Sequence, residues 1–216
     1  MPGAKLPVKS DGSSYYSNEA LDVFRLSSKN HADIPILLPN GDVIHALISQ
    51  PTPPVFDGAE DRNGLRNHDE IRLWADYISN EAYLMDDSGV GGGLAAEAHF
   101  VVMGDLNADP FDGDSADEAI TQLLNHNSIN PDVTFGDKIP ASEGGKENNK
   151  NSADQGAPEH DTSFFGLRID YVLPSNTFDV IDSGVFWPAS SDPLNILVAN
   201  GAASDHLCVW TDVKLR

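Results

Sequence analysis

The stretch Phe100 to Ser115, FVVMGDLNADPFDGDS, decides the fold class of this 216-residue chain. Its first four residues form a short continuous apolar run, which is typical of a strand buried on both faces. The GDLNADP that follows places Asp105 and Asn107 on a tight turn directly after that strand. Because ligands of layered α/β proteins bind where strands end, we treat these two polar side chains as candidate site residues.

Two strands and a helix are predicted before this stretch. Apolar runs at 34–38 and 43–48 flank Asn40-Gly41, and Asn-Gly between such runs predicts an antiparallel hairpin. Asn67 and Glu70 resemble a capping box, which predicts that a helix begins at Asn67. Four apolar side chains then share one face of this helix: Ile71, Trp74, Ala75 and Ile78.

After the stretch, the pattern predicts one helix, one loop and three strands. The helix is expected at 115–125, with Ser115 and Glu118 as its capping box, and the polar residues 136–160 are expected to form a long surface loop. The strands are expected at 169–173, 180–186 and 207–215, and residues 1–20 read as irregular. Strands at both ends with helices between them predict a layered α/β or α+β domain.

Composition excludes several classes of protein. The chain has 34 acidic and 13 basic residues, for a net charge of −21, which argues against a basic nucleic-acid clamp or an anionic-membrane binder. One cysteine, Cys208, allows neither a disulfide framework nor a cysteine zinc site. No apolar run approaches the ~18 residues of a membrane span, and the first fourteen residues lack the apolar stretch of a signal peptide. The acidic excess indicates a solvated surface or carboxylates that hold a cation.

Common catalytic motifs are absent from the sequence. There is no GxSxG, HExxH, GxxxxGK[ST] or GxGxxG, so the serine hydrolase, zincin, P-loop and dinucleotide-binding classes are excluded. Asp105-x-Asn107-x-Asp109 begins like an EF-hand loop, but Pro110 and Ala116 stand where that loop needs Gly and Glu.

Polar residues at the predicted strand ends suit a hard divalent cation. Asp105 and Asn107 offer carboxylate and amide oxygens, the ligands that Mg²⁺ prefers, although both residue types also form ordinary turns. Ser204-Asp205-His206 adds a carboxylate beside an imidazole. Asp170, among apolar neighbours in a predicted strand, needs a partner and could orient His206 by accepting its second N–H.

Four segments in order resemble the endonuclease/exonuclease/phosphatase superfamily, the DNase I-like fold, and especially a bacterial branch of it. They are HALISQPTPPVFDGAEDRNGLRNHDEIRLWADYI (45–78), FVVMGDLNADPFDGDS (100–115), FFGLRIDYVLPS (164–175) and SDHLCVW (204–210). The resemblance covers 25–216 and implies an α+β domain, a two-sheet β-sandwich flanked by helices, preceded by an irregular segment, 1–24. It also implies hydrolysis of phosphoester bonds that depends on Mg²⁺, or on Mn²⁺ or Ca²⁺ in its place.

The resemblance also implies roles for individual residues. Asp105 would orient or deprotonate the attacking water, and Asn107 would contact the scissile phosphate or the metal. His206, held by Asp170, would stabilise charge on the phosphoryl oxygens, and Asp205 would ligate or position the metal. The metal ligands implied are therefore Asp205, Asp105 and Asn107.

Two departures from the family pattern are visible. Gln50 stands where the family usually has His; it can hydrogen-bond a phosphate oxygen but cannot transfer a proton. The family's first strands, with an Asn and a metal-binding Glu, have no counterpart. We therefore expect the C-terminal part of the two-sheet sandwich, with Met1 an internal methionine and one sheet face uncovered.

Basic residues before and within the predicted helix bear on the substrate. Arg62, Arg66 and Arg72 fall within eleven residues, interleaved with Asn67. Such a cluster suits bidentate phosphate contacts, so Arg62, Arg66 and Asn67 join Gln50 as candidate phosphate-binding residues. An equally supported alternative is that these side chains pair with acidic neighbours at a solvent-exposed helix start. The patch is too small to track a duplex, which favours a small phosphoester or a local nuclease contact.

Three functions follow from this reading. The first is a Mg²⁺-dependent phosphodiesterase, nuclease or phosphatase; the second is a truncated, catalytically impaired member that at most binds a cation or phosphate. The third is a calcium-binding surface module built on four carboxylates: Asp109, Asp112, Asp114 and Asp117. We predict a phosphoester substrate, no membrane span and no partner protein. Localisation is open: full-length relatives suit an extracellular or periplasmic site, but this chain has no export signal.

Overall fold

The computed structural model describes residues 1–148, 155–201 and 203–216. The strands are β1 (His31–Leu37), β2 (Val43–Ser49), β3 (His99–Asp105), β4 (Asp170–Pro174), β5 (Phe178–Phe186) and β6 (Cys208–Leu215). The α-helices are α1 (Asn18–Leu21), α2 (Arg62–Ile78), α3 (Thr121–Leu124) and α4 (Glu143–Asn148). Short 3₁₀ turns are η1 (Ala116–Glu118), η2 (Pro131–Val133), η3 (Pro158–His160), η4 (Pro193–Leu197) and η5 (Ala199–Gly201). None of the described helices is long and apolar enough to cross a membrane.

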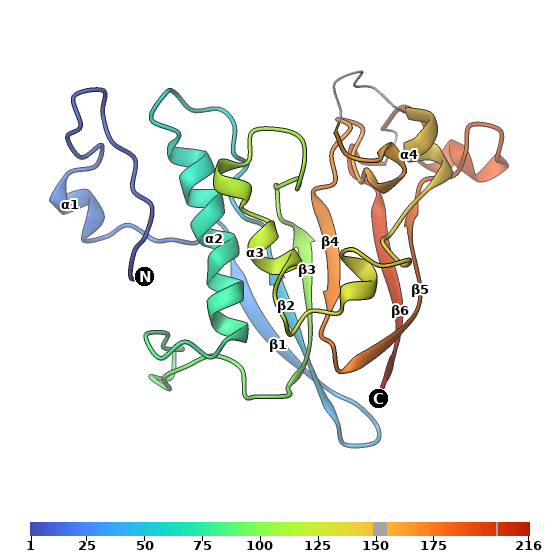
Figure 1. Ribbon diagram of the computed structural model, residues 1–216, viewed down its shortest axis with the longest axis horizontal. Helices are drawn as coiled ribbons and strands as arrows, with labels where there is room; N and C mark the ends of the chain where they lie inside the picture. Colours follow the sequence, from blue (N-terminus) through green and yellow to red (C-terminus); the bar gives the residue numbers. More distant parts are fainter. Residues whose placement is uncertain (149–154, 202) are drawn as a thin grey trace.

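The strands form two sheets. The larger has the order β1-β2-β3-β4, with β1 and β2 antiparallel, β2 and β3 parallel, and β3 and β4 antiparallel. The smaller is the antiparallel pair of β5 and β6, and β6 contacts β4, so the second sheet lies beside the free edge of the first (Figure 1). Two sheets with helices confirm the expected fold class, and the predicted Asn-Gly hairpin is the β1–β2 pair.

One face of the larger sheet packs against α2 and α3 (Figure 1). The period of two along each strand decides which side chains point to this face. The main core consists of fully buried side chains from strands and helices, among them Leu47, Val102, Leu173, Ile71 and Leu123. Burying each such side chain contributes about 1.5–3 kcal/mol, so this layer holds the sheet and helices together.

The opposite face of the sheet is apolar and open at its β1 edge. Ile34 and Ile36 are 44% and 47% exposed. Pairing of β1 with β2 and of β2 with β3 puts Val101 and Met103 on this same face. At β1 this face is thus partly exposed, whereas Ala46 of β2 and Val101 of β3 on the same face are buried.

Helix α2 begins at Arg62, five residues before the predicted start. Asn67 lies inside the helix and caps nothing. The first turn is capped from the preceding loop, because the Asp57 carboxylate accepts the Asn63 backbone N–H at 2.6 Å. The capping-box prediction was wrong because the Asn-x-x-Glu spacing also occurs within a helix. The predicted apolar face is confirmed: Ile71 and the apolar residues that follow it pack into the core.

Two other predicted elements differ from the structure. The helix expected at 115–125 is divided into η1 and α3, because Asp117 and Glu118 have positive φ angles of 46° and 52°. The apolar side chains of Ile120, Leu123 and Leu124 still enter the core. The loop expected at 136–160 contains α4 and η3, and Gly144 and Gly145 are buried where α4 packs closely. The centre of that loop, 149–154, lies outside the described residues.

The N-terminal segment is held against α2 by arginine side chains. Arg66 donates Nε–H to the Leu26 carbonyl at 2.9 Å and Nη2–H to the Arg25 carbonyl at 2.7 Å. Its guanidinium also lies 4.8 Å from the centre of the Phe24 ring. Arg66 therefore anchors this segment, and its role in phosphate binding stays a prediction.

Replacing Arg66 with Ala should release this segment. We expect faster hydrogen exchange at the backbone amides of residues 20–28 and a loss of about 1 kcal/mol of stability, since two hydrogen bonds from a charged donor disappear. Phosphate-ester affinity should not change. Arg25→Ala is the matched control, because this exposed side chain anchors nothing among the described residues. Weaker ester binding by Arg66→Ala alone would restore the phosphate-binding assignment.

Glycine is required at the end of β3. Gly104 has a φ of +146°, and a Cβ there would collide with the carbonyl oxygen of Ser49 on β2. The absence of a side chain lets β2 and β3 approach closely directly before Asp105.

We expect Gly104→Ala to lower the free energy of unfolding by about 3 kcal/mol or more, because backbone strain and a backbone collision add together. Urea unfolding followed by circular dichroism measures this. Gly12→Ala separates the two effects, since Gly12 also has a positive φ, +81°, but open space around it. An equal loss for both variants would mean that the close approach to Ser49 costs nothing.

Candidate active site

The site lies at the end of β3, where Asp105 pairs directly with Asp170 of β4. Both side chains belong to the face of the sheet opposite α2, since Asp105 follows Met103 by two residues. Oxygen atoms of Asp105 and Asp170 and a ring nitrogen of His206 all lie within 4.8 Å of one another. Residues predicted from three separate segments are thus brought together.

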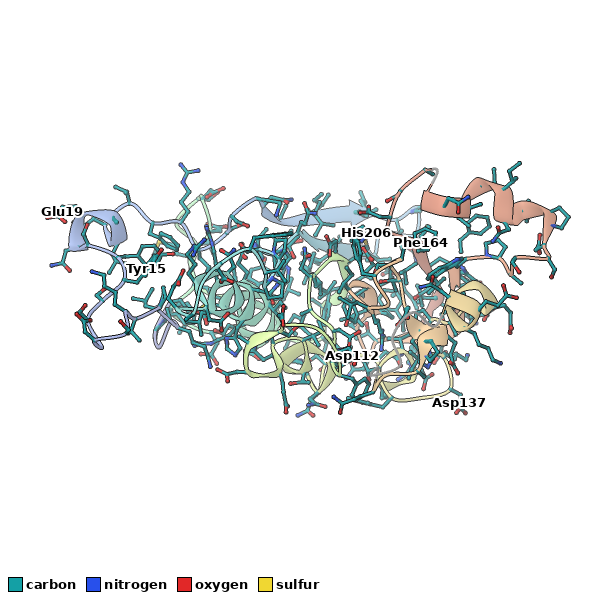
Figure 2. All side chains as sticks on the ribbon, turned by 90° about the horizontal axis from the view of Figure 1, so that it is seen from above. Tyr15, Glu19, Asp112, Asp137, Phe164 and His206 are labelled. Carbon is teal, nitrogen blue, oxygen red and sulfur yellow. The ribbon has the colours of Figure 1, made fainter. Side chains whose placement is uncertain are left out.

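His206 is oriented by Asp170. Its Nδ1 lies 2.9 Å and 3.1 Å from the two carboxylate oxygens, while Nε2 has no hydrogen-bond partner among the described residues. The chain before β6 fixes the histidine backbone, because Ser163 forms a bridge with His206 and Leu207 N–H donates to the Thr162 carbonyl at 2.8 Å. Figure 2 shows His206 beside Phe164, with Asp112 well apart from both.

Opposing effects set the protonation of this pair. Burial disfavours the charged imidazole of His206, but the hydrogen bond and charge of Asp170, with the charges of Asp105 and Asp205, outweigh it and raise the pKa of His206. Burial raises the pKa of Asp170 despite the hydrogen bonds from His206 and Thr162. The carboxylates around His206 therefore favour its charged form.

Asp105 is held by three donors. Its Oδ1 accepts the Asn107 backbone N–H at 3.0 Å, and its Oδ2 accepts the side-chain amides of Asn107 at 3.0 Å and Gln50 at 3.1 Å. Asn107 adopts a φ of +52°, a left-handed conformation that Asn tolerates, and this folds its amide back onto Asp105. Gln50 and Asn107 therefore both lie at the site.

The donor set fits a divalent cation. Asp105 and Asp170 supply carboxylate oxygens, and Asn107 Oδ1 accepts no hydrogen bond from the described residues. Oxygen ligands of this kind suit Mg²⁺ or Mn²⁺. Asp205 is exposed and stands outside the group of three, although its charge acts on His206.

Three predicted phosphate-binding residues are engaged with other groups. Arg62 forms an ion pair with Glu60 and donates to the Phe56 carbonyl, and Arg66 anchors the N-terminal segment. Asn67 is fully buried, with its amide donated to backbone carbonyls. These contacts favour the alternative of paired side chains at the helix start, and the phosphate-binding roles stay predictions.

Three of the four carboxylates in the acidic cluster considered for calcium are engaged with protein groups. Asp109 is buried and accepts the backbone N–H groups of Phe111, Asp112 and Arg168. Asp112 accepts from the backbone of 155–156, and Asp117 pairs with Lys5. These contacts disfavour the calcium-module hypothesis.

Sequence reasoning missed Thr162. Its hydroxyl donates to Asp170 Oδ2 at 2.8 Å and accepts the Asp170 backbone N–H at 3.0 Å, which fixes the carboxylate that orients His206. No local motif marks this threonine, because it meets Asp170 only through the turn between them.

Two of three comparisons with known proteins found similar proteins. The sequence model of the Endonuclease/Exonuclease/phosphatase family matches residues 9–206. A comparison with curated protein sequences gives no match. Among solved structures, an endonuclease/exonuclease/phosphatase from Beutenbergia cavernae DSM 12333 is similar, with 16% identity and a TM-score of 0.47 over 85% of this chain and 38% of that one. The chain thus spans less than half of that protein's length. From the extent of the family match, the chain belongs to the Endonuclease/Exonuclease/phosphatase family.

Proposed function

We propose that the chain carries the catalytic end of a phosphoester hydrolase that uses a divalent cation. The grouping of Asp105, Asp170 and His206 supports this most directly. The group places two carboxylates and a histidine of raised pKa at the end of a strand. The name of the family to which the chain belongs covers nucleases and phosphatases. Perturbed titratable groups gathered in this way mark candidate catalytic sites.

In the proposed reaction, water attacks phosphorus and the bond to the leaving oxygen breaks. The leaving oxygen keeps the bonding electron pair and takes up a proton from solvent. The Asp105 carboxylate orients this water and accepts its proton, since its oxygens are directed by Gln50 and Asn107. His206, protonated and held by Asp170, donates Nε2–H to a phosphoryl oxygen as negative charge accumulates there.

A divalent cation held by Asp105, with Asn107 Oδ1 as a further ligand, would supply additional positive charge at the phosphoryl oxygens. Gln50 donates a hydrogen bond but has no titratable proton, so protonation of the leaving group does not fall to it. This arrangement supports Mg²⁺ or Mn²⁺ dependence.

The substrate proposed is a small phosphoester or one local phosphate of a nucleic acid. The net charge of −21 opposes a long polyanion, and the arginines once considered for phosphate binding hold the N-terminal segment and Glu60 instead.

His206→Ala should reduce hydrolysis by at least about 100-fold, because the charged donor at the phosphoryl oxygen is removed. Turnover of a generic phosphodiester and a phosphomonoester by the purified chain, with Mg²⁺ titrated and an EDTA blank, measures this. His126→Ala is the control: this histidine lies beyond the other end of β3, where it contacts Ser79. The proposal would be wrong if the wild type still turned over in EDTA, or if His206→Ala kept wild-type turnover. A folded wild-type chain with no turnover would favour the second function, a catalytically impaired family member.

Cation binding should depend on Asp105. We expect Asp105→Asn to weaken Mg²⁺ or Mn²⁺ binding about tenfold or more, because one unit of ligand charge is lost. Asp205→Asn should have a smaller effect, since that carboxylate is exposed and outside the group of three. Isothermal titration calorimetry measures both, with Asp179→Asn, a surface partner of Arg216, as control. Equal weakening by Asp105→Asn and Asp179→Asn would show that the cation binds through general surface charge.

A further inference from the structure

Two loops of the site meet through the side chain of one buried residue of α2. Asn67 has no exposed surface. Its Nδ2 donates to the Thr52 carbonyl at 2.8 Å and to the Leu106 carbonyl at 3.0 Å. Thr52 follows Gln50 by two residues, and Leu106 stands between Asp105 and Asn107. One amide therefore links the loop that carries Gln50 to the loop that carries Asp105.

A second buried side chain of the same helix holds the Thr52 peptide from its other side. Glu70 is fully buried, and its Oε2 accepts the Thr52 backbone N–H at 2.6 Å. Its Oε1 accepts the Ser28 backbone N–H at 2.6 Å. The Thr52 peptide is thus fixed at both its N–H and its carbonyl by residues one turn apart on α2.

The two loops also contact each other directly at the site. Asn107 donates its side-chain amide to the Pro51 carbonyl at 3.1 Å, and Gln50 donates to Asp105 at 3.1 Å. Because these contacts are partly exposed, they compete with water. The bond from Asn67 to the Leu106 carbonyl is buried and lacks that competition, while its bond to the Thr52 carbonyl is partly buried. The Asn67 side chain itself has no exposed surface, so its two bonds hold the separation of the loops.

Stability alone does not explain Asn67. Its Oδ1 is buried without a hydrogen-bond partner among the described residues, and so is Thr52 Oγ1. Unpartnered polar atoms in a core are costly, and an apolar side chain of similar volume would avoid the cost at Asn67. The presence of an amide at this position therefore favours a role for its two N–H donors, which bind the Thr52 and Leu106 carbonyls.

We propose that Asn67 is a positioning residue that sets the distance between Gln50 and Asp105, with Glu70 as its support. This inference rests on the proposed function in assigning a role to that distance. The contacts predict that losing the amide changes the site without moving the chain's core, because α2 remains packed through its apolar face.

Asn67→Leu tests the proposal, since leucine has a similar volume and no donors. We expect hydrogen exchange at the Thr52 and Asn107 backbone amides to rise at least tenfold beyond any global change. Mg²⁺ or Mn²⁺ affinity should fall three- to tenfold, and kcat should fall more than KM rises. Ile78→Ala is the control, because it weakens the core of the same helix without touching either loop.

The outcomes separate positioning from stability and from the proposed function. Equal exchange and cation affinity in Asn67→Leu and wild type would overturn the positioning role, as would changes in both variants that simply follow their loss of stability. If the wild type neither binds the cation nor hydrolyses esters, the proposed function fails, while the exchange at Thr52 and Asn107 still decides whether Asn67 joins the loops. Should Asn67→Leu fail to fold, Asn67→Ser replaces it with the same expected changes.

Discussion

The pairing of β3 with β4 imposes the constraint on which the site depends, because it puts Asp105 directly opposite Asp170. Like charges across a strand pair repel each other. The surrounding side chains offset that repulsion: His206 bonds to Asp170, and amides of Gln50 and Asn107 donate to Asp105. Each of these donors comes from a different segment, so hydrogen bonds to the two carboxylates bring these segments together in one site.

Helix α2 supports this arrangement from the other side of the sheet. Its apolar face, with Ile71 and Trp74, packs on the strands, while Asn67 and Glu70 at its N-terminal half reach the loop after β2. Arg66 of the same helix donates to the carbonyls of Arg25 and Leu26, and Glu70 also accepts the Ser28 backbone N–H. One helix therefore holds both the site loops and the N-terminal segment.

Local sequence patterns predicted the hairpin, β3, the last three strands and the identity of Asp105, Asn107, Asp170 and His206, because strand ends and buried carboxylates leave local signals. They failed where a side chain acts at long range. Asn67 resembles a cap and Arg66 a phosphate ligand by residue type alone; only the approach of residues about 40 positions away shows that each binds backbone carbonyls. Thr162 was missed for the same reason.

The distribution of positive charge limits what the site can accept. The carboxylates of Asp170, Asp105 and Asp205 favour the charged form of His206. Neither a lysine nor an arginine contributes to the shifted pKa values of His206 or Asp170. Exposed charges act over about 10 Å at ordinary ionic strength, so much of the acidic surface opposes an extended polyanion. The proposed contact with a local phosphoester therefore requires less positive charge than binding along a duplex would.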